Sequence, residues 1–166
     1  MIHDPQHTLT AIAVALPQGL RLSFADDAVM NVDLTAAIRR YPTLAALADP
    51  RLFAQAHLDA RGGYVVWIDG DVEMAADNLR HLAVEQAGGI GHERLWNWMH
   101  ENGLTQARAA AAIGISRRML NYYVSGAKPI PKTVWLACVG WVTEQQRPRR
   151  RATNPAPRTV GAATQR

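Results

Sequence analysis

The chain has 166 residues, of which 48% are hydrophobic, and a net charge of +4 at neutral pH. This length and apolar content suit one domain or two small ones with a packed core, and they argue against global disorder. The single cysteine, Cys138, excludes a disulfide framework and a multi-cysteine zinc site. No apolar run approaches the roughly 18 residues of a membrane-spanning helix, and the N-terminal stretch lacks the regions of a signal peptide. We therefore expect a cytoplasmic protein with no membrane partner.

The charges are distributed unevenly along the chain. Residues 1–83 contain six arginines against ten acidic residues, whereas residues 84–146 contain six basic against four acidic residues. The last twenty residues add six arginines and no acid. This asymmetry indicates an acidic half that faces something other than nucleic acid and a basic half suited to phosphate.

The chain begins with strand-like patterns. Residues 9–16, 20–24 and 29–34 are largely apolar segments bounded by Pro, Gly and Asp, and Leu20, Leu22 and Phe24 alternate with polar residues. Such patterns are typical of half-buried antiparallel strands.

The segments that follow are mixed. Residues 43–55 predict two short helical turns interrupted at Asp49, because the residue before a proline avoids helical geometry. Residues 57–70 predict a hairpin that turns at Gly62–Gly63, and residues 74–86 predict a helix. Residues 1–86 are therefore expected to form a small α+β domain with an antiparallel sheet.

Residues 87–91, AGGIG, interrupt the pattern and are interpreted as a linker. They do not make a phosphate loop, because no strand precedes them and no Lys-Ser/Thr follows. Residues 92–146 predict a bundle of helices, with N-caps at Thr105 and Ser116 and a last helix that starts near Pro131. The first of these helices, over residues 92–101, is expected to carry Leu95, Trp96 and Met99 on one side. Residues 147–166 are basic and proline-containing, and we expect them to be disordered.

The third of these helices has two different faces. At 100° per residue, its polar face carries Arg117, Arg118, Asn121 and Tyr122. The opposite face carries apolar side chains and can pack. Small residues such as Ala110 on the preceding helix allow close approach, and Gly114 lies where the chain must reverse.

Residues 92–143 resemble the repressor-type helix-turn-helix family, which includes regulators similar to the lambda and 434 repressors. The resemblance is carried by Leu104-Thr105-Gln106, Ala110, Ile113-Gly114-Ile115-Ser116, Tyr123, Ser125-Gly126 and Pro129-Ile130-Pro131. The chain departs from the family at residues 107–109, where Ala-Arg-Ala replaces bulkier residues. The resemblance implies an all-α, repressor-like bundle behind the α+β domain.

The resemblance also implies contacts with double-stranded DNA. The helix that starts after Ser116 would enter the major groove, where Arg117 and Arg118 suit guanine and Asn121 suits adenine. Tyr122 would contact a sugar, a thymine methyl group or a phosphate. Gln106 matches a position that commonly contacts backbone phosphate, and Thr105 is its neighbouring cap residue. Lys128 follows the helix and suits a phosphate contact, which would set register and not sequence.

Simpler interpretations of the same residues stay open. Two arginines on a helix are commonly solvated charge, and Gln106 can be a polar residue of the helix start alone. Asn121 and Tyr122 can be ordinary surface residues. Residues 149–151, three arginines, favour a non-specific phosphate-attracting arm over a specific reader, because a disordered arm cannot hold base geometry.

The first half resembles an uncharacterised bacterial domain-of-unknown-function family that occurs alone or in front of a small helix-turn-helix. The similarity is carried by LRLSFADDAVMNVDLT and by the landmarks Asp49-Pro50, Phe53 and Trp67. It implies only that this domain senses or binds a protein or a small molecule.

No catalytic, metal or cofactor site is expected, so the sequence does not indicate an enzyme. Acidic residues at positions 69, 71 and 73 alternate, and on one strand face they would suit a metal, but such a row is more often a solvated turn. His92-Glu93 does not continue to HExxH, since position 96 is Trp.

Four tryptophans, at positions 96, 98, 135 and 141, and an almost wholly apolar last helix provide more apolar surface than one bundle needs. We expect either docking on the first domain or, preferably, a homodimer. The sequence thus predicts a DNA-binding transcriptional regulator. The rival is a protein-interaction module, such as an antitoxin-like partner, whose helical half dimerises. An enzyme that uses the hairpin acids is a third, weaker alternative.

Overall fold

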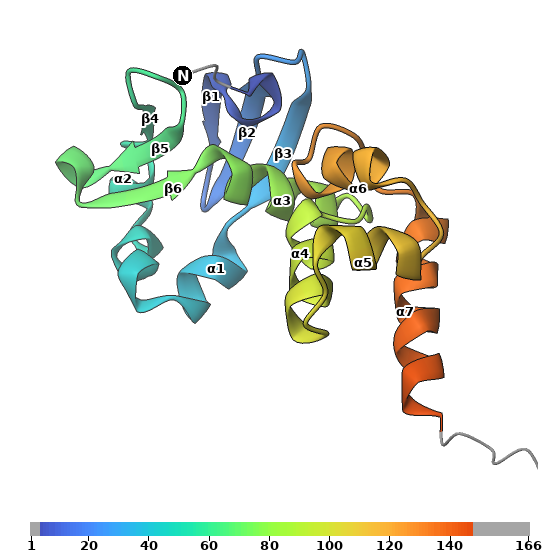
Figure 1. Ribbon diagram of the computed structural model, residues 1–166. Coiled ribbons are helices and arrows are strands. Elements are labelled where there is room, and N and C mark those ends of the chain that lie inside the picture. The colour runs from blue at the N-terminus through green and yellow to red at the C-terminus, as the bar shows by residue number, and fades with distance from the viewer. Residues whose placement is uncertain (1–3, 148–166) are drawn as a thin grey trace, which may run out of the picture.

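The computed structural model describes residues 4–147, which form two adjacent groups of elements (Figure 1). The first group contains two antiparallel sheets and several short helices. Its elements are η1 (Pro5–His7), β1 (Leu9–Ala15), β2 (Gly19–Phe24), β3 (Val29–Asp33), α1 (Thr35–Arg40), η2 (Pro42–Ala48), α2 (Pro50–Phe53), β4 (His57–Leu58), β5 (Tyr64–Trp67), η3 (Ile68–Gly70), β6 (Val72–Ala75) and α3 (Ala76–Gln86), where η denotes a 3-10 helix. The predicted α+β class with antiparallel sheets is confirmed.

The two sheets have strand orders β1-β2-β3 and β4-β5-β6. In β2, Leu20 and Leu22 are buried whereas Arg21 is exposed, as the alternation predicts. The sheets meet where the Leu9 N–H donates to the Gly62 carbonyl at 2.7 Å. Gly62 has a φ of 69°, and a Cβ there would lie 2.1 Å from the Leu9 carbonyl oxygen, so this hairpin turn requires glycine.

The structure differs from the sequence prediction around residues 68–75. A short strand, β6, includes the first two residues of the predicted helix, 74 and 75. The acidic row does not align on one strand face, in agreement with the favoured interpretation as a turn. Asp69 lies in the η3 turn with a φ of 52°, Asp71 follows that turn, and only Glu73 lies in a strand. Among residues 4–147, no group of three or more His, Cys, Asp or Glu side chains is placed to hold a metal ion.

The first hydrophobic core lies between the sheets and α3. Trp67 is fully buried, and its indole N–H donates to the Phe53 carbonyl at 3.0 Å. Helix α3 contributes Leu79 and Ala83 and packs against β3 and β6. Phe53 and Trp67, two landmarks of the sequence resemblance, therefore fix the centre of this core.

The second group is entirely helical, and none of its helices, nor any other among residues 4–147, could cross a membrane. Its elements are α4 (His92–Glu101), α5 (Gln106–Ala112), α6 (Arg117–Val124) and α7 (Lys132–Gln146). Both expected N-caps form: Thr105 Oγ1 accepts from the Arg108 N–H at 3.3 Å, and Ser116 Oγ accepts from the Met119 N–H at 3.1 Å. The predicted disordered tail, apart from its first residue, lies outside the described residues.

One tryptophan assignment is wrong. Trp96 was expected to pack beside Leu95 and Met99, but it is 46% exposed, and Trp98 is buried instead. Residues 95, 98 and 99 are related as i, i+3 and i+4 and so share one helix face, and this is the face that the neighbouring helices cover. Trp98 also packs edge-to-face on Trp141 of α7, with 5.8 Å between the ring centroids.

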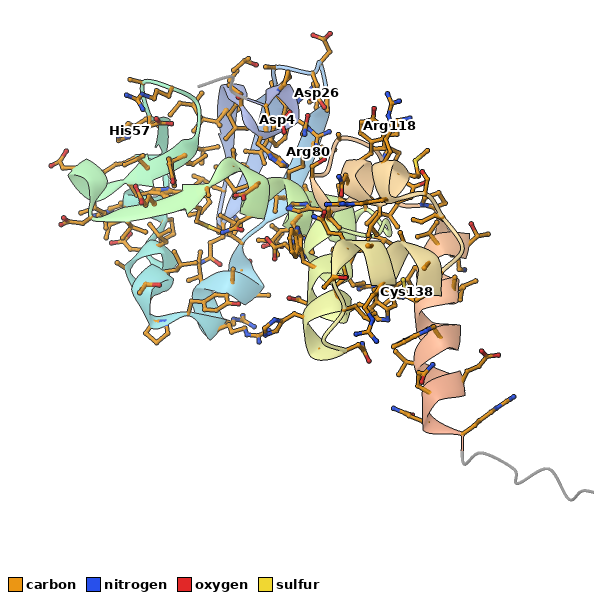
Figure 2. All side chains as sticks on the ribbon, viewed as in Figure 1. Asp4, Asp26, His57, Arg80, Arg118 and Cys138 are labelled. Carbon is orange, nitrogen blue, oxygen red and sulfur yellow. The ribbon has the colours of Figure 1, made fainter. Side chains whose placement is uncertain are left out.

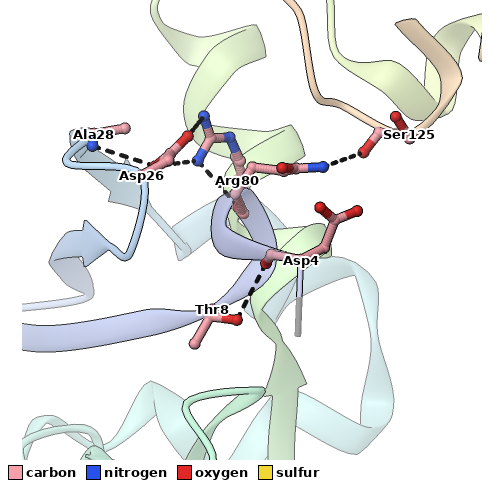
Figure 3. A network of polar contacts seen from close by, with 7 residues as sticks. Asp4, Thr8, Asp26, Ala28, Arg80 and Ser125 are labelled. Carbon is pink, nitrogen blue, oxygen red and sulfur yellow. Dashed lines mark hydrogen bonds and ion pairs between the residues drawn. The ribbon is translucent and has the colours of Figure 1, made fainter. Parts of the chain in front are cut away.

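The two groups are joined by an ion pair and hydrogen bonds that run from α3 through η1 to the end of α6 (Figure 3). The Arg80 guanidinium of α3 pairs with Asp26 at 2.7 Å and donates to the Gln6 carbonyl at 3.0 Å. The Gln6 amide then donates to the carbonyl of Ser125, just after α6, at 3.2 Å. Desolvation alone would raise the pKa of Asp26, but Arg80 and the Ala28 N–H outweigh it and hold that pKa below its usual range.

Candidate nucleic-acid interface

Helix α6 presents one polar face and buries the other. Arg117, Arg118 and Asn121 are exposed, whereas Leu120 and Tyr123 are buried against the other helices. The i, i+3, i+4 spacing of the buried residues Leu120, Tyr123 and Val124 fixes this rotation of the helix about its axis. Figure 2 shows Arg118 at the outer surface of the helical group.

Three of the predicted site residues contact one another. Arg118 Nε donates to the Tyr122 hydroxyl at 3.1 Å, and its guanidinium lies 5.6 Å from the Tyr122 ring centroid. Lys128 Nζ lies 4.9 Å from the same centroid, and the Lys128 N–H donates to the Tyr122 carbonyl at 3.1 Å. Tyr122 thus holds two cations beside one ring by cation–π attraction and one hydrogen bond.

These cations have no acidic partner among the described residues. The ion pairs within residues 4–147 are Arg80–Asp26 and Arg94–Glu85, and His81 Nε2 lies 3.7 Å from the Glu93 carboxylate. None of them includes Arg117, Arg118 or Lys128. An uncompensated, exposed cationic surface of this kind attracts phosphate and other anions.

The remaining predicted residues lie at helix starts. Thr105 and Ser116 are exposed, and each uses its hydroxyl oxygen to accept a cap bond. Their O–H groups can still donate to an anion, since a hydroxyl is both donor and acceptor. Gln106 is half-buried at the first position of α5. Within residues 4–147 no side-chain hydrogen bond joins Thr105 or Gln106 to the α6 residues.

The helical group has further exposed cations that were not predicted as site residues. Arg108 on α5 and Lys132 at the start of α7 are exposed, and neither belongs to the ion pairs of the described residues. Charge was their only sequence signal, and charge alone does not separate a binding residue from a solvated one.

One acidic residue of the first group, Asp59, has a structural role. The Asp59 carboxylate accepts from the N–H groups of Arg61 at 3.0 Å and Tyr64 at 2.8 Å, which closes the β4–β5 turn. Desolvation opposes ionisation of Asp59, but these backbone N–H groups hold its pKa below the usual range. In the helical group, burial raises the pKa of the Cys138 thiol to about 11, so this thiol stays protonated.

Comparison with known proteins supports the two sequence resemblances unequally. Residues 12–85 match the family described as Protein of unknown function (DUF2442), which confirms the domain-of-unknown-function prediction. No curated protein matches the chain. A crystal structure of the putative DNA binding protein NE0471 from Nitrosomonas europaea is 42% identical, with a TM-score of 0.75, over 93% of this chain and 96% of that chain. The chain therefore belongs to the same family as NE0471, and residues 12–85 of this chain carry the DUF2442 match.

Proposed function

We propose that the chain is a sequence-specific DNA-binding protein and a bacterial transcriptional regulator, not an enzyme. One observation carries the proposal: α6 presents Arg117, Arg118 and Asn121 to solvent, without acidic partners among the described residues, while its opposite face is packed. Arginine and asparagine are the side chains that read guanine and adenine by paired hydrogen bonds in the major groove.

In this proposal α5 and α6 act as a repressor-type helix-turn-helix. Helix α6 enters the major groove from its Ser116 end, and Arg118 approaches DNA already oriented by the Tyr122 hydroxyl. Lys128, Gln106 and Thr105 contact phosphates and set the position of the protein along the duplex. The description of NE0471 as a putative DNA binding protein agrees with this role.

The domain arrangement and the oligomeric state belong to the same proposal. Residues 1–86 form the α+β domain, residues 87–91 the linker and residues 92–146 the DNA-binding domain, in a cytoplasmic protein. The functional unit is a homodimer, because helix-turn-helix proteins read paired half-sites about one turn of DNA apart. Leu136 and Val139 of α7, which are 55% and 45% exposed, are the proposed contact.

A protein-interaction module, such as an antitoxin-like partner, is the second candidate. The exposed apolar face of α7 favours it, because that face would suit a different protein as well as a second copy. The two candidates differ in what contacts Arg117 and Arg118: DNA in the first, protein in the second.

The test is binding of the purified chain to a DNA fragment from upstream of its own gene and to a scrambled fragment, across a salt series. In the Arg117→Ala/Arg118→Ala variant we expect the preference for the upstream fragment to fall by at least about tenfold, since each good arginine–guanine pair is worth about 1–3 kcal/mol. Arg51→Ala/Arg61→Ala, at two exposed arginines of the first group, is the matched control.

Circular dichroism verifies that both variants are folded. Equal, weak and salt-sensitive binding of all proteins to both fragments would reject specific readout by α6. The protein-interaction module would then be the better proposal.

A further inference from the structure

A groove of about 630 Å³ lies where α1, β6, α3 and the first turn of α4 come together. Its volume is that of a small-molecule site. Part of its lining is apolar, from Leu44, Met74 and Leu82, and the exposed rings of Tyr41 and Tyr64 also line it. The groove therefore offers an apolar and aromatic surface to a ligand of modest size.

One carboxylate of the groove has no ion-pair partner among the described residues and so favours a cation. Glu73 of β6 and Glu93 of α4 both line it, and Glu73 belongs to none of the ion pairs within residues 4–147. The one arginine of the lining, Arg40, lies with its guanidinium 5.6 Å from the Tyr41 ring centroid. Carboxylates beside tyrosine rings stabilise an ammonium or guanidinium group by charge and by cation–π attraction.

We propose that this groove binds a small organic cation with an apolar or aromatic body. The ammonium group lies by Glu73, and the body of the ligand covers the apolar lining between Tyr64 and Leu82. A ligand of this kind is the small-molecule partner of the first group of elements.

The position of the groove connects the ligand to the helical group. Glu93 belongs to the first turn of α4, and His81 of α3, also in the lining, lies 3.7 Å from it. Helix α4 is joined to the end of α6 through Trp96, whose indole N–H donates to the Val124 carbonyl at 2.9 Å. A ligand in the groove contacts both groups, so it changes the docking of the helical group and thereby DNA affinity. This regulatory step rests on the proposed function.

The binding test uses two probes with the same ring and opposite charge, phenethylamine and 3-phenylpropionate. Each is titrated into the full-length, ¹⁵N-labelled chain, and amide shifts are followed by NMR. We expect saturable shifts around Tyr64, Glu73 and Asn78 with phenethylamine and much weaker binding of 3-phenylpropionate. Glu73→Gln should weaken phenethylamine binding by about fivefold, the size of one partly exposed ion pair.

Asp71→Asn, an exposed acid of the same hairpin outside the groove, is the matched control and should leave binding unchanged. The proposed site is overturned if phenethylamine causes no saturable shifts there, if both probes bind equally, or if Glu73→Gln binds phenethylamine as the unsubstituted chain does.

DNA affinity measured with and without phenethylamine forms a separate arm. A change that disappears in Glu73→Gln supports the regulatory step, and an unchanged affinity overturns it. If the chain binds no DNA at all, the proposed function fails, while the NMR titration still decides whether the groove binds cations.

Discussion

The cap of the proposed recognition helix is a single hydroxyl group. Ser116 Oγ accepts the Met119 N–H, and Ser116 itself is exposed. Ser116→Ala should lower the free energy of unfolding by about 1 kcal/mol, because the cap bond is lost. Ser116→Asp should retain stability, since aspartate is an equally good cap, yet it should weaken DNA binding by repelling phosphate.

Urea unfolding and DNA titration of the two variants separate these effects. If Ser116→Asp bound DNA as tightly as the unsubstituted chain, the N-terminal end of α6 would not approach phosphate. If Ser116→Ala were as stable as the unsubstituted chain, the hydroxyl would contribute nothing to the helix.

Individual residues were predictable where their role depends on nearby sequence. Caps at Thr105 and Ser116 and the reversal at Gly114, which has a φ of 73°, follow from local residue preferences, and all three are present. Hydrophobicity does not distinguish Trp96 from Trp98, because both residues are tryptophan. Which of the two is buried depends on the side of α4 that faces the neighbouring helices.

At the scale of elements, three histidines meet where η1, α3 and α4 come together. The ring centroids of His7 and His92 are 5.4 Å apart, and those of His81 and His92 are 5.8 Å apart. Burial, followed by the charges of His7 and His81, lowers the pKa of His92 from 6.5 to about 4, with Arg80 acting in the same direction and Asp77 opposing it. This junction is therefore most stable when His92 is neutral.

The sign of the pH dependence follows from proton binding. Between pH 6.5 and about 4 the unfolded chain binds a proton at His92 that the folded chain does not, so stability falls as pH falls through this range. Above pH 6.5 the contribution is complete. Because His92 is partly exposed, we expect a loss on the order of 1 kcal/mol by pH 4.5.

Urea unfolding at pH 8 and pH 4.5 measures this loss. His92→Gln should reduce the difference between the two pH values, whereas His57→Gln, at an exposed histidine far from the junction, should not. A pH dependence unchanged by His92→Gln would assign the titration to other groups.

The elements that were not predicted, α1 and β6, are short. Helix α1 has six residues, and its N-cap, Leu34, makes no side-chain cap bond. Strand β6 has four residues and runs directly into α3, so its last two residues were assigned to the predicted helix. The acids at 69, 71 and 73 alternate in sequence but do not share a strand face, because Asp69 lies in η3 and only Glu73 lies in β6.

At the scale of the whole molecule, the contacts between the two groups could not be predicted. Gln6 bonds Ser125, 119 positions away, and it accepts from Arg80, 74 positions away. The groove likewise needs residues from α1, β6, α3 and α4. The polar face of α6, in contrast, was predictable because eight consecutive residues define it. The candidate nucleic-acid interface could therefore be predicted from local periodicity, whereas the groove depends on tertiary contacts that the sequence pattern does not show.

We predict that the exposed apolar residues of α7 form the contact between the two copies of a homodimer. Leu136 and Val139 are one i, i+3 step apart on α7, which lies on the side of the helical group away from the sheets (Figure 1). Leu136→Glu/Val139→Glu places charge on this face and should yield a monomer in sedimentation velocity. Loss of the second half-site contact should weaken binding to a palindromic site on the order of 100-fold.

Leu16→Glu, at an apolar residue 62% exposed in the first group, is the control and should stay dimeric. A dimer that survives the double substitution would assign the interface to another surface, whereas a monomeric unsubstituted chain that still reads its operator would show that one α6 is sufficient.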